Sequence, residues 1–143
     1  MTAFTFSPYV GPLPLHFGMT RREVKTILGP PDETVDDETG LLVERRLNVN
    51  VGYSASDGRL KEVVFTPDAE LHYQGHNLFH VDDLIGFLRK TDPKPQLFVG
   101  DVIFCELGIG LSGFHNNDES QKAISLYSRG DLDDFIDDFV PFT

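Results

Sequence analysis

The sequence predicts an α+β fold, in which two αβββ pseudo-repeats form one curved antiparallel sheet of about six strands with helices packed on one face. Residues 19–28 and 81–90 each repeat apolar side chains with a helical period. Residues 47–53 and 107–113 each alternate apolar with small or polar side chains, which is the period of a half-buried strand. Each αβββ unit exposes an apolar sheet face that it cannot cover alone, so we expect the two units to join.

The size and composition predict one domain. The chain has 143 residues, of which 40% are hydrophobic and 24% are charged. A chain of this length buries roughly two-thirds of its surface on folding, which supports one full core over residues 1–143. No apolar run approaches the ~20 residues that span a bilayer, and residues 1–10 lack the basic and apolar regions of a signal peptide. We therefore expect a cytoplasmic protein without membrane contact, and a monomer.

The first unit starts with an extended lead-in over residues 8–18, which holds three prolines. Thr20 and Glu23 then predict a capping box, in which each side chain bonds the other residue's backbone N–H group. Gly29 and the two prolines that follow it end the helix. The apolar face of this helix is formed by Val24, Ile27 and Leu28.

Three strands follow this helix after an acidic loop. Residues 41–46 and 47–53 are expected to form the first two strands. Residues 60–66 return as the third strand, after a turn that contains Asp57 and Gly58.

The second unit repeats this order, with a helix over residues 81–90 that carries acidic residues in its first turn and basic residues in its last turn. Its strands are expected at residues 97–105, 107–113 and 122–127. Thr20 precedes Val49 by 29 residues, and His80 precedes Ile109 by the same spacing. The pseudo-repeats are therefore placed at residues 10–70 and 76–130.

The remaining residues, 131–143, form an acidic amphipathic tail. Every polar position between residues 132 and 140 is an aspartate, and the apolar residues between them repeat with a helical period. We expect a short helix or turn here that ends at Pro141. Its apolar face is formed by Leu132, Phe135, Ile136, Phe139 and Val140.

Residues 10–32 carry a recurrent motif. It consists of Gly-Met-Thr at residues 18–20, Glu-Val at residues 23–24 and Leu-Gly-Pro-Pro at residues 28–31. The motif resembles the β-lactamase inhibitor protein fold, which small outer-membrane assembly lipoproteins share. The resemblance implies helices that are each followed by three strands, in two tandem units as in the inhibitor. Because the motif residues are helix caps and core, the resemblance concerns the fold, and function does not follow from a shared fold.

The acidic residues are concentrated in two short segments. The chain has 12 basic and 23 acidic residues and a net charge of −11. Residues 32–38 and residues 131–138 each hold five acidic residues and no basic residue. Such fields repel nucleic-acid phosphates, which argues against DNA or RNA binding. They would attract a basic protein partner, although the alternative is that the acidity only keeps the protein soluble.

These observations favour a non-enzymatic protein-binding module, of which an intracellular immunity-type or inhibitor protein is one version. Exposed tyrosines are typical anchors at protein interfaces, and carboxylates supply charge that complements a basic partner. The candidate partner-binding residues are Asp36, Asp37, Glu38, Tyr53, Tyr73, Tyr127, Asp133, Asp134, Asp137 and Asp138.

The alternative function is a small metal- or ligand-binding enzyme. His72, His76 and His80 recur every four residues, and on a helix two of them could hold a metal ion. Gly75 and Asn77 argue against a continuous helix, so we interpret this segment as a connector without a metal.

No catalytic motif is recognisable, and we expect no cofactor. Residues 108–113 match G-x-G-x-x-G, but a dinucleotide site needs this motif between a strand and a helix. Here it lies within a predicted strand that leads to another strand, so we reject a dinucleotide site. Cys105 is the single cysteine, which excludes an intramolecular disulfide, and its apolar neighbours predict a small buried side chain.

Overall fold

The computed structural model of the protein describes residues 2–36 and 40–142. Asp37 and Glu38, two of the candidate partner-binding residues, lie outside the described residues. The elements are, in chain order, β1 (Ala3–Ser7), β2 (Gly11–Leu13), α1 (Arg21–Leu28), β3 (Glu33–Asp36), β4 (Leu42–Arg46), β5 (Val49–Tyr53), β6 (Leu60–Phe65), β7 (Glu70–Tyr73), β8 (His76–Asn77), the 3₁₀ helix η1 (Leu78–His80), α2 (Leu84–Arg89), β9 (Gln96–Phe98), β10 (Asp101–Phe104), β11 (Ile109–Ser112), the 3₁₀ helix η2 (Glu119–Gln121), β12 (Ala123–Tyr127), the 3₁₀ helix η3 (Asp133–Asp138) and β13 (Val140–Pro141).

The strands form two sheets, and this arrangement corrects the predicted fold. One sheet has nine antiparallel strands in the order β13-β9-β10-β11-β12-β6-β5-β4-β3, and the other has four strands in the order β2-β1-β7-β8. Strands account for 38% of the described residues and helices for 19%. The prediction of an α+β fold with one six-stranded sheet and helices packed on one face is therefore wrong.

The additional strands lie mainly in segments without a recognisable strand pattern. The residues before the lead-in contribute β1, and the lead-in contributes β2. The connector contributes β7 and β8, and the first acidic segment contributes β3. Their backbone groups are satisfied by partners that lie elsewhere in the chain, as when β1 pairs with β7, and no local pattern reveals such a partner. The predicted strand 97–105 is instead divided into β9 and β10, because Val99 and Gly100 both have positive φ angles, of 48° and 83°.

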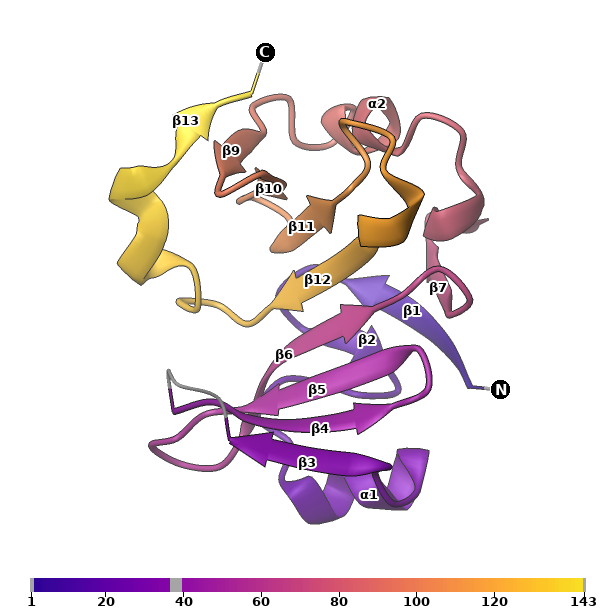
Figure 1. Ribbon diagram of the computed structural model, residues 1–143, viewed down its shortest axis with the longest axis vertical. Coiled ribbons are helices and arrows are strands. Elements are labelled where there is room, and N and C mark those ends of the chain that lie inside the picture. Colours follow the sequence, from indigo (N-terminus) through magenta and orange to yellow (C-terminus); the bar gives the residue numbers. More distant parts are fainter. Residues whose placement is uncertain (1, 37–39, 143) are drawn as a thin grey trace.

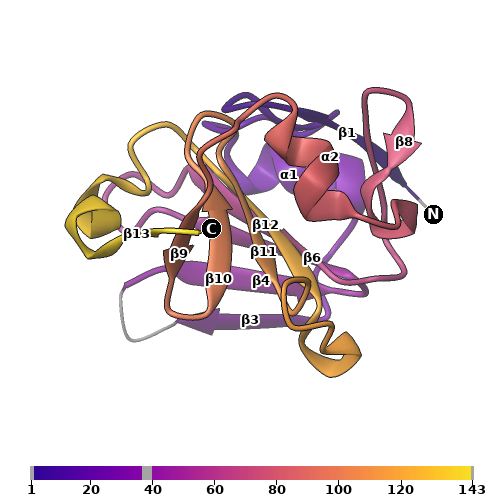
Figure 2. The same cartoon turned by 90° about the horizontal axis from the view of Figure 1, so that it is seen from above.

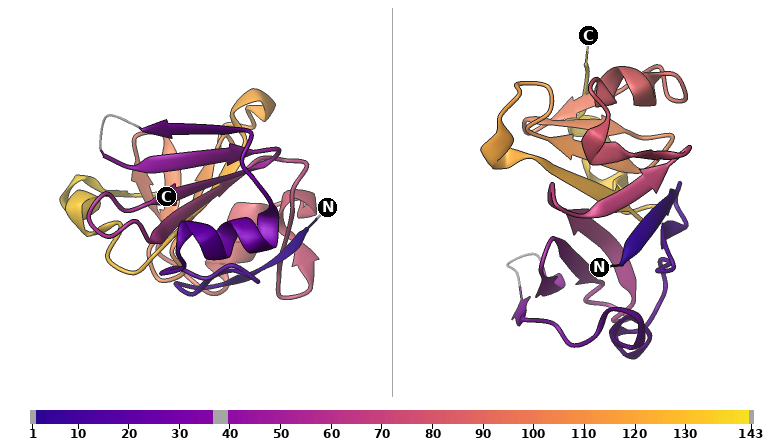
Figure 3. Two further views of the ribbon diagram at one scale, coloured as in Figure 1. Left: turned by 90° about the horizontal axis from the view of Figure 1, so that it is seen from below. Right: turned by 90° about the vertical axis from the view of Figure 1, so that its right-hand side faces the viewer.

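The two sheets and the two α-helices form two layers around one core (Figures 2 and 3). The nine-stranded sheet is one layer, and α1, the four-stranded sheet and α2 together make the other. Phe4 of β1 contacts Phe65 of β6 with 5.1 Å between the ring centroids, and Val24 of α1 and Leu88 of α2 belong to the same buried cluster. The other face of the nine-stranded sheet, which we call the open face, is turned toward the viewer in Figure 1.

The β6–β12 pair joins the two halves of the chain at the middle of the nine-stranded sheet. In the first half α1 is followed by the four strands β3 to β6, and in the second half α2 is followed by the four strands β9 to β12. The last strands of these two series, β6 and β12, pair with each other. Val63 lies opposite Leu126, and both side chains are fully buried in the core. Glu62 lies opposite Tyr127, and both belong to the open face. The proposed pseudo-repeat boundaries stay a prediction.

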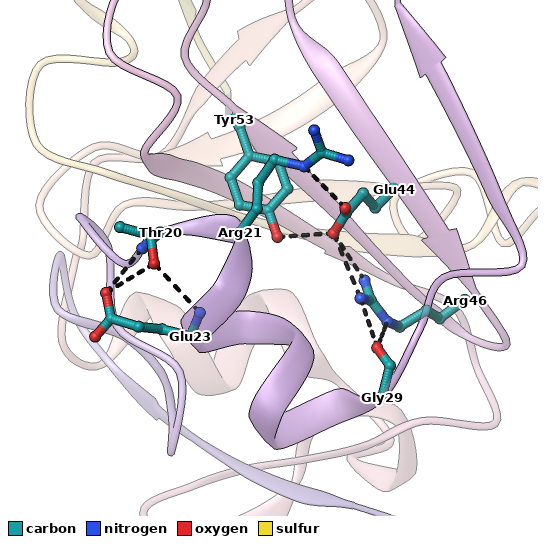
Figure 4. A network of polar contacts seen from close by, with 7 residues as sticks. All are labelled: Thr20, Arg21, Glu23, Gly29, Glu44, Arg46 and Tyr53. Atoms are coloured by element: carbon teal, nitrogen blue, oxygen red, sulfur yellow. Dashed lines mark hydrogen bonds and ion pairs between the residues drawn. The ribbon is translucent and has the colours of Figure 1, made fainter.

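The predicted capping box at the start of α1 is confirmed (Figure 4). The backbone N–H of Glu23 donates to Thr20 Oγ1 at 3.2 Å, and the backbone N–H of Thr20 donates to Glu23 Oε1 at 3.0 Å. Val24 is fully buried, and Gly29 ends the helix with a φ of 83°. Among the helices of the described ranges, none is long and apolar enough to cross a membrane.

Loss of the Thr20 cap is expected to destabilise the protein. Thr20→Ala leaves the Glu23 N–H without its side-chain acceptor, and removal of such a cap costs about 1 kcal/mol. Thr26→Ala is the matched control, because Thr26 lies within the same helix and its hydroxyl donates only to the Arg22 carbonyl one turn earlier. Urea denaturation should give a lower midpoint for the Thr20 variant alone. Equal midpoints for both variants would contradict this role of the cap.

Candidate functional site

The open face carries a groove of about 640 Å³. It lies where β5, β9 and β12 end and where β6 and β10 begin, on the left-hand side of Figure 1. The first half of the chain lines it with residues 40–41, 54–56 and 61–62. The second half lines it with residues 98–99, 101, 103, 127, 130–132 and 134–135. The groove therefore spans the β6–β12 pair and depends on the joining of the two halves.

Tyr127 lies in the groove beside a glycine that makes room for its ring. A Cβ atom on Gly110 would lie 3.1 Å from Tyr127 Cε2 and 2.9 Å from Ile103 Cδ1, so a larger residue would displace these side chains. Gly108 makes room in a similar way for the ring of Tyr9. Gly108, in the turn before β11, and Gly110, within β11, thus allow close packing of aromatic rings, and neither precedes a helix as a dinucleotide site requires.

The charged side chains of the groove are mainly acidic. Among the described residues, four carboxylates line it, from Glu62, Asp101, Asp131 and Asp134, and one ammonium group, from Lys61. Lys61 Nζ lies 3.1 Å from Asp131 Oδ1, so this positive charge is already paired within the protein. Burial raises the pKa of the Tyr127 hydroxyl, and the nearby Glu62 carboxylate raises it further, which keeps the phenol neutral.

Apolar side chains from the end of β9 and from the acidic tail lie next to these charged groups in the groove lining. Phe98 lies at the end of β9, and its ring centroid is 5.3 Å from that of Phe135 and 5.1 Å from that of Phe139. Val99 is 85% exposed and Phe135 is 44% exposed, although both line the groove. We call Phe98, Val99 and Phe135 the apolar shelf. Exposed apolar groups next to charges are common at protein-binding surfaces.

The structure separates the predicted acidic partner-binding residues into two groups. Asp134 lines the groove. The other predicted acidic side chains among the described residues are exposed and do not line the groove. Three of them belong to η3, and the fourth, Asp36, is the last residue of β3 and lies opposite Leu42. The residues of this second group are Asp36, Asp133, Asp137 and Asp138.

The three predicted tyrosine anchors lie in three different environments. Tyr127 lines the groove and is half-buried. Tyr73 is half-buried next to the core, where its ring lies 5.0 Å from Phe6 and 6.5 Å from Phe87. Tyr53 is fully buried, so the prediction that it is exposed is wrong. Its ring lies on the core face of β5, and its hydroxyl has a polar partner there.

That partner is Glu44, a buried carboxylate with three side-chain donors (Figure 4). The Tyr53 hydroxyl donates to Glu44 Oε1 at 2.8 Å, and Arg21 Nε donates to Oε2 at 3.0 Å. Arg46 donates to the Glu44 carboxylate at 3.3 Å and to the Gly29 carbonyl at 2.8 Å. Burial raises the pKa of the Tyr53 hydroxyl, and acceptance by Glu44 raises it further. This cluster fastens both ends of α1 to β4.

Sequence reasoning missed Glu44, although a signal was present. Glu44 occupies the same face of β4 as Leu42, because side chains two residues apart on a strand point to the same side. A carboxylate on the apolar face of a strand next to two arginines indicates a buried ion pair.

A second cavity of about 340 Å³ lies between β1, the end of α1 and the β4–β5 turn. Its lining is mainly apolar, and Arg46, which also lines it, already donates to Glu44 and Gly29. The groove is larger and carries an excess of negative charge, so we place the candidate site there.

The three histidines of the alternative metal site do not lie on a helix. His72 belongs to β7 and His76 to β8, and His80 ends η1. His72 Nε2 lies 3.8 Å from Glu70 Oε2, whereas the His76 ring lies 5.3 Å from that of Phe87. Within residues 2–36 and 40–142, no group of three or more His, Cys, Asp or Glu side chains is arranged to hold a metal ion.

Cys105 is half-buried at the end of β10. Burial raises the pKa of its thiol, which disfavours the reactive thiolate.

A scan against protein-family models, a search of curated proteins and a search of solved structures found no match to this chain. The resemblance of residues 10–32 to the β-lactamase inhibitor protein fold therefore stays a prediction.

Removal of the Tyr53 hydroxyl is expected to destabilise the fold. Tyr53→Phe takes one of three donors from a carboxylate whose side chain is 4% exposed, and a lost hydrogen bond to a buried charge costs about 2 kcal/mol. Tyr73→Phe is the control, because it keeps the ring contacts with Phe6 and Phe87. The free energy of unfolding from urea denaturation should fall for the Tyr53 variant only, and equal values for both variants would contradict the role of Glu44.

The Asp131 carboxyl is expected to lower stability as it ionises. Burial raises its pKa above the ordinary value, and the Lys61 ion pair offsets this only in part. Because the unfolded chain ionises at the ordinary pKa, the folded state loses relative stability as pH rises through the carboxyl range. The free energy of unfolding of the wild type relative to Asp131→Asn should therefore fall as pH rises above about 4. A rise over this range in urea denaturation would show that the Lys61 pair outweighs burial.

Proposed function

We propose that the protein is a non-enzymatic protein-binding module whose groove takes a basic segment of a partner protein. The observation that carries this proposal is the charge of the groove lining, where the described residues supply four carboxylates and one ammonium group, which is paired with Asp131. Such a surface attracts cations over several ångströms and disfavours anions.

The apolar shelf supports a polypeptide as the occupant. Val99 and Phe135 offer exposed apolar area next to the carboxylates. A segment that alternates basic and apolar side chains would contact the carboxylates with the first and the apolar shelf with the second. Affinity at such surfaces comes mainly from a few buried apolar or aromatic anchors, whereas exposed charges act chiefly on association.

One concrete version of this function is an intracellular immunity-type or inhibitor protein, which would cover a basic surface of its target. A cytoplasmic location and a monomeric state belong to this proposal.

The groove is tested by two variants with the same charge change. Asp134 lines the groove, whereas Asp137 is exposed on the same 3₁₀ helix outside the lining. We expect Asp134→Asn to slow association of basic peptides about three-fold, because it removes a carboxylate from the contact surface, and Asp137→Asn to have a smaller effect. The measurement is stopped-flow fluorescence with a panel of labelled peptides that alternate lysine or arginine with leucine or phenylalanine, at two salt concentrations.

Nuclear magnetic resonance of the wild-type protein provides the second readout. Backbone resonances of groove residues such as Lys61, Asp101 and Tyr127 should shift when a basic peptide binds. The absence of shifts in the groove with every peptide, or equal effects of the two variants, would show that the acidity serves solubility alone.

A further inference from the structure

The two sheets have four edge strands in the described residues, and three of these strands are poor templates for another strand. β2 contains Pro12, β8 has two residues, and β13 has two residues and contains Pro141. Proline and short length are common protections of sheet edges, because they remove backbone donors or leave too few of them.

β3 differs from these three edges. It has four residues, Glu33–Asp36, contains no proline and pairs on one side only, with β4. Glu33, Thr34 and Asp36 are exposed and Val35 is half-buried. One row of backbone N–H and C=O groups of this strand is therefore directed away from the sheet.

The acidic residues of β3 lie on both faces of the strand. Glu33 lies opposite Arg45, whose Nη1 is 3.9 Å from Glu33 Oε2 in an exposed ion pair, and Asp36 lies opposite Leu42. Because successive side chains of a strand alternate between faces, residues three apart point to opposite sides. A strand that pairs with β3 meets one carboxylate on each face, separated by three residues.

We propose that β3 accepts an additional strand from a basic partner protein, which extends the nine-stranded sheet by strand addition. The fitting segment has lysine or arginine at positions i and i+3, opposite Asp36 and Glu33, and β-branched residues between them, opposite Val35 and Thr34. Backbone hydrogen bonds supply the affinity, and the spacing of the two cations supplies the specificity.

The charges of β3 disfavour a second copy of this chain as the occupant. Antiparallel pairing of two β3 strands in centred register places Glu33 opposite Asp36 twice, and parallel pairing in register places each carboxylate opposite its own copy. Like charges directly opposite each other destabilise a strand pair, whereas opposite charges stabilise it. The same carboxylates that discourage self-association thus favour a cationic strand.

This inference does not depend on the groove, because the edge of β3 and the groove lining have no residue in common. The experiments below keep the two surfaces apart by means of separate variants.

Three labelled peptides test strand addition to the full-length protein. Thr-Lys-Val-Thr-Lys-Val has cations at i and i+3, Val-Lys-Thr-Lys-Val-Thr has the same composition with cations at i and i+2, and Thr-Lys-Pro-Thr-Lys-Val lacks one backbone donor. Fluorescence anisotropy should show about three-fold weaker binding of the second peptide, which places only one cation opposite a carboxylate, and a larger loss for the third. Hydrogen exchange of the amides of β3 should slow with the first peptide.

Three variants complete the design. Glu33→Gln combined with Asp36→Asn should weaken binding of the first peptide about five-fold, because two opposite-charge pairs are lost. Asp137→Asn combined with Asp138→Asn changes the net charge equally, from −11 to −9, and should have a smaller effect. Asp134→Asn changes the groove alone, so the first peptide should slow hydrogen exchange of the β3 amides in this variant as much as in the wild type.

Equal binding of the three peptides, or no slowing of exchange in β3, would overturn the proposal. Weaker binding in the Asp134 variant alone would assign these peptides to the groove and also overturn it. Sedimentation of the wild type as a dimer in which the amides of β3 exchange more slowly than in the monomer would identify a second copy as the occupant instead.

Discussion

The pairing of β6 with β12 is the interaction on which the rest of the structure depends. It joins the two halves of the chain through four pairs of residues, and its register decides which side chains reach the core. Val63 and Leu126 lie opposite each other in the core, while Glu62 and Tyr127 lie opposite each other in the groove. A slip of one strand by one residue would exchange its two faces, so apolar side chains would lose the core and the groove would lose its acidic and aromatic lining. Burial of the core thus fixes the geometry of the candidate site.

The buried Glu44 carboxylate gives the first half of the sheet a second fixed point. Arg21 reaches it from the start of α1, and Arg46 links it to the carbonyl of Gly29 at the end of that helix. A buried ion pair adds little net stability compared with apolar residues, because both charges must be desolvated, but an unpaired partner would be strongly unfavourable. The cluster therefore fixes the position of α1 on the sheet, because only one arrangement of the helix gives Glu44, Arg21 and Arg46 their partners. This arrangement leaves the open face uncovered.

The parts of the fold that the sequence predicts are those that local chemistry determines. The capping box of Thr20 and Glu23 needs only four consecutive residues, and the structure contains both of its hydrogen bonds. β3 could not be predicted from its own residues, because its charged side chains are typical of a loop. The strand is stabilised by its pairing with β4, which the local sequence does not reveal. The prediction of an exposed Tyr53 rests on the use of tyrosines as interface anchors, and it fails because the hydroxyl has a buried partner, Glu44, nine residues away on the neighbouring strand. In the groove, Asp134 and Tyr127 were among the predicted residues, but Lys61, Glu62 and Asp101 meet them only through sheet pairing.

The two acidic segments belong to the two ends of the same nine-stranded sheet. The first contains β3, which is one edge, and the second contains η3, which directly precedes β13 at the other edge. Carboxylates at free edges oppose association between sheets of identical molecules, and this accounts for acidity near both edges without any partner. It does not account for Glu62 and Asp101, which lie on inner strands and line the groove. Acidity that extends from an edge onto the face of a sheet needs a second cause. Attraction of a basic partner is a cause that acts on the face and on the edge alike, and the apolar shelf adds the contact area that such a partner requires.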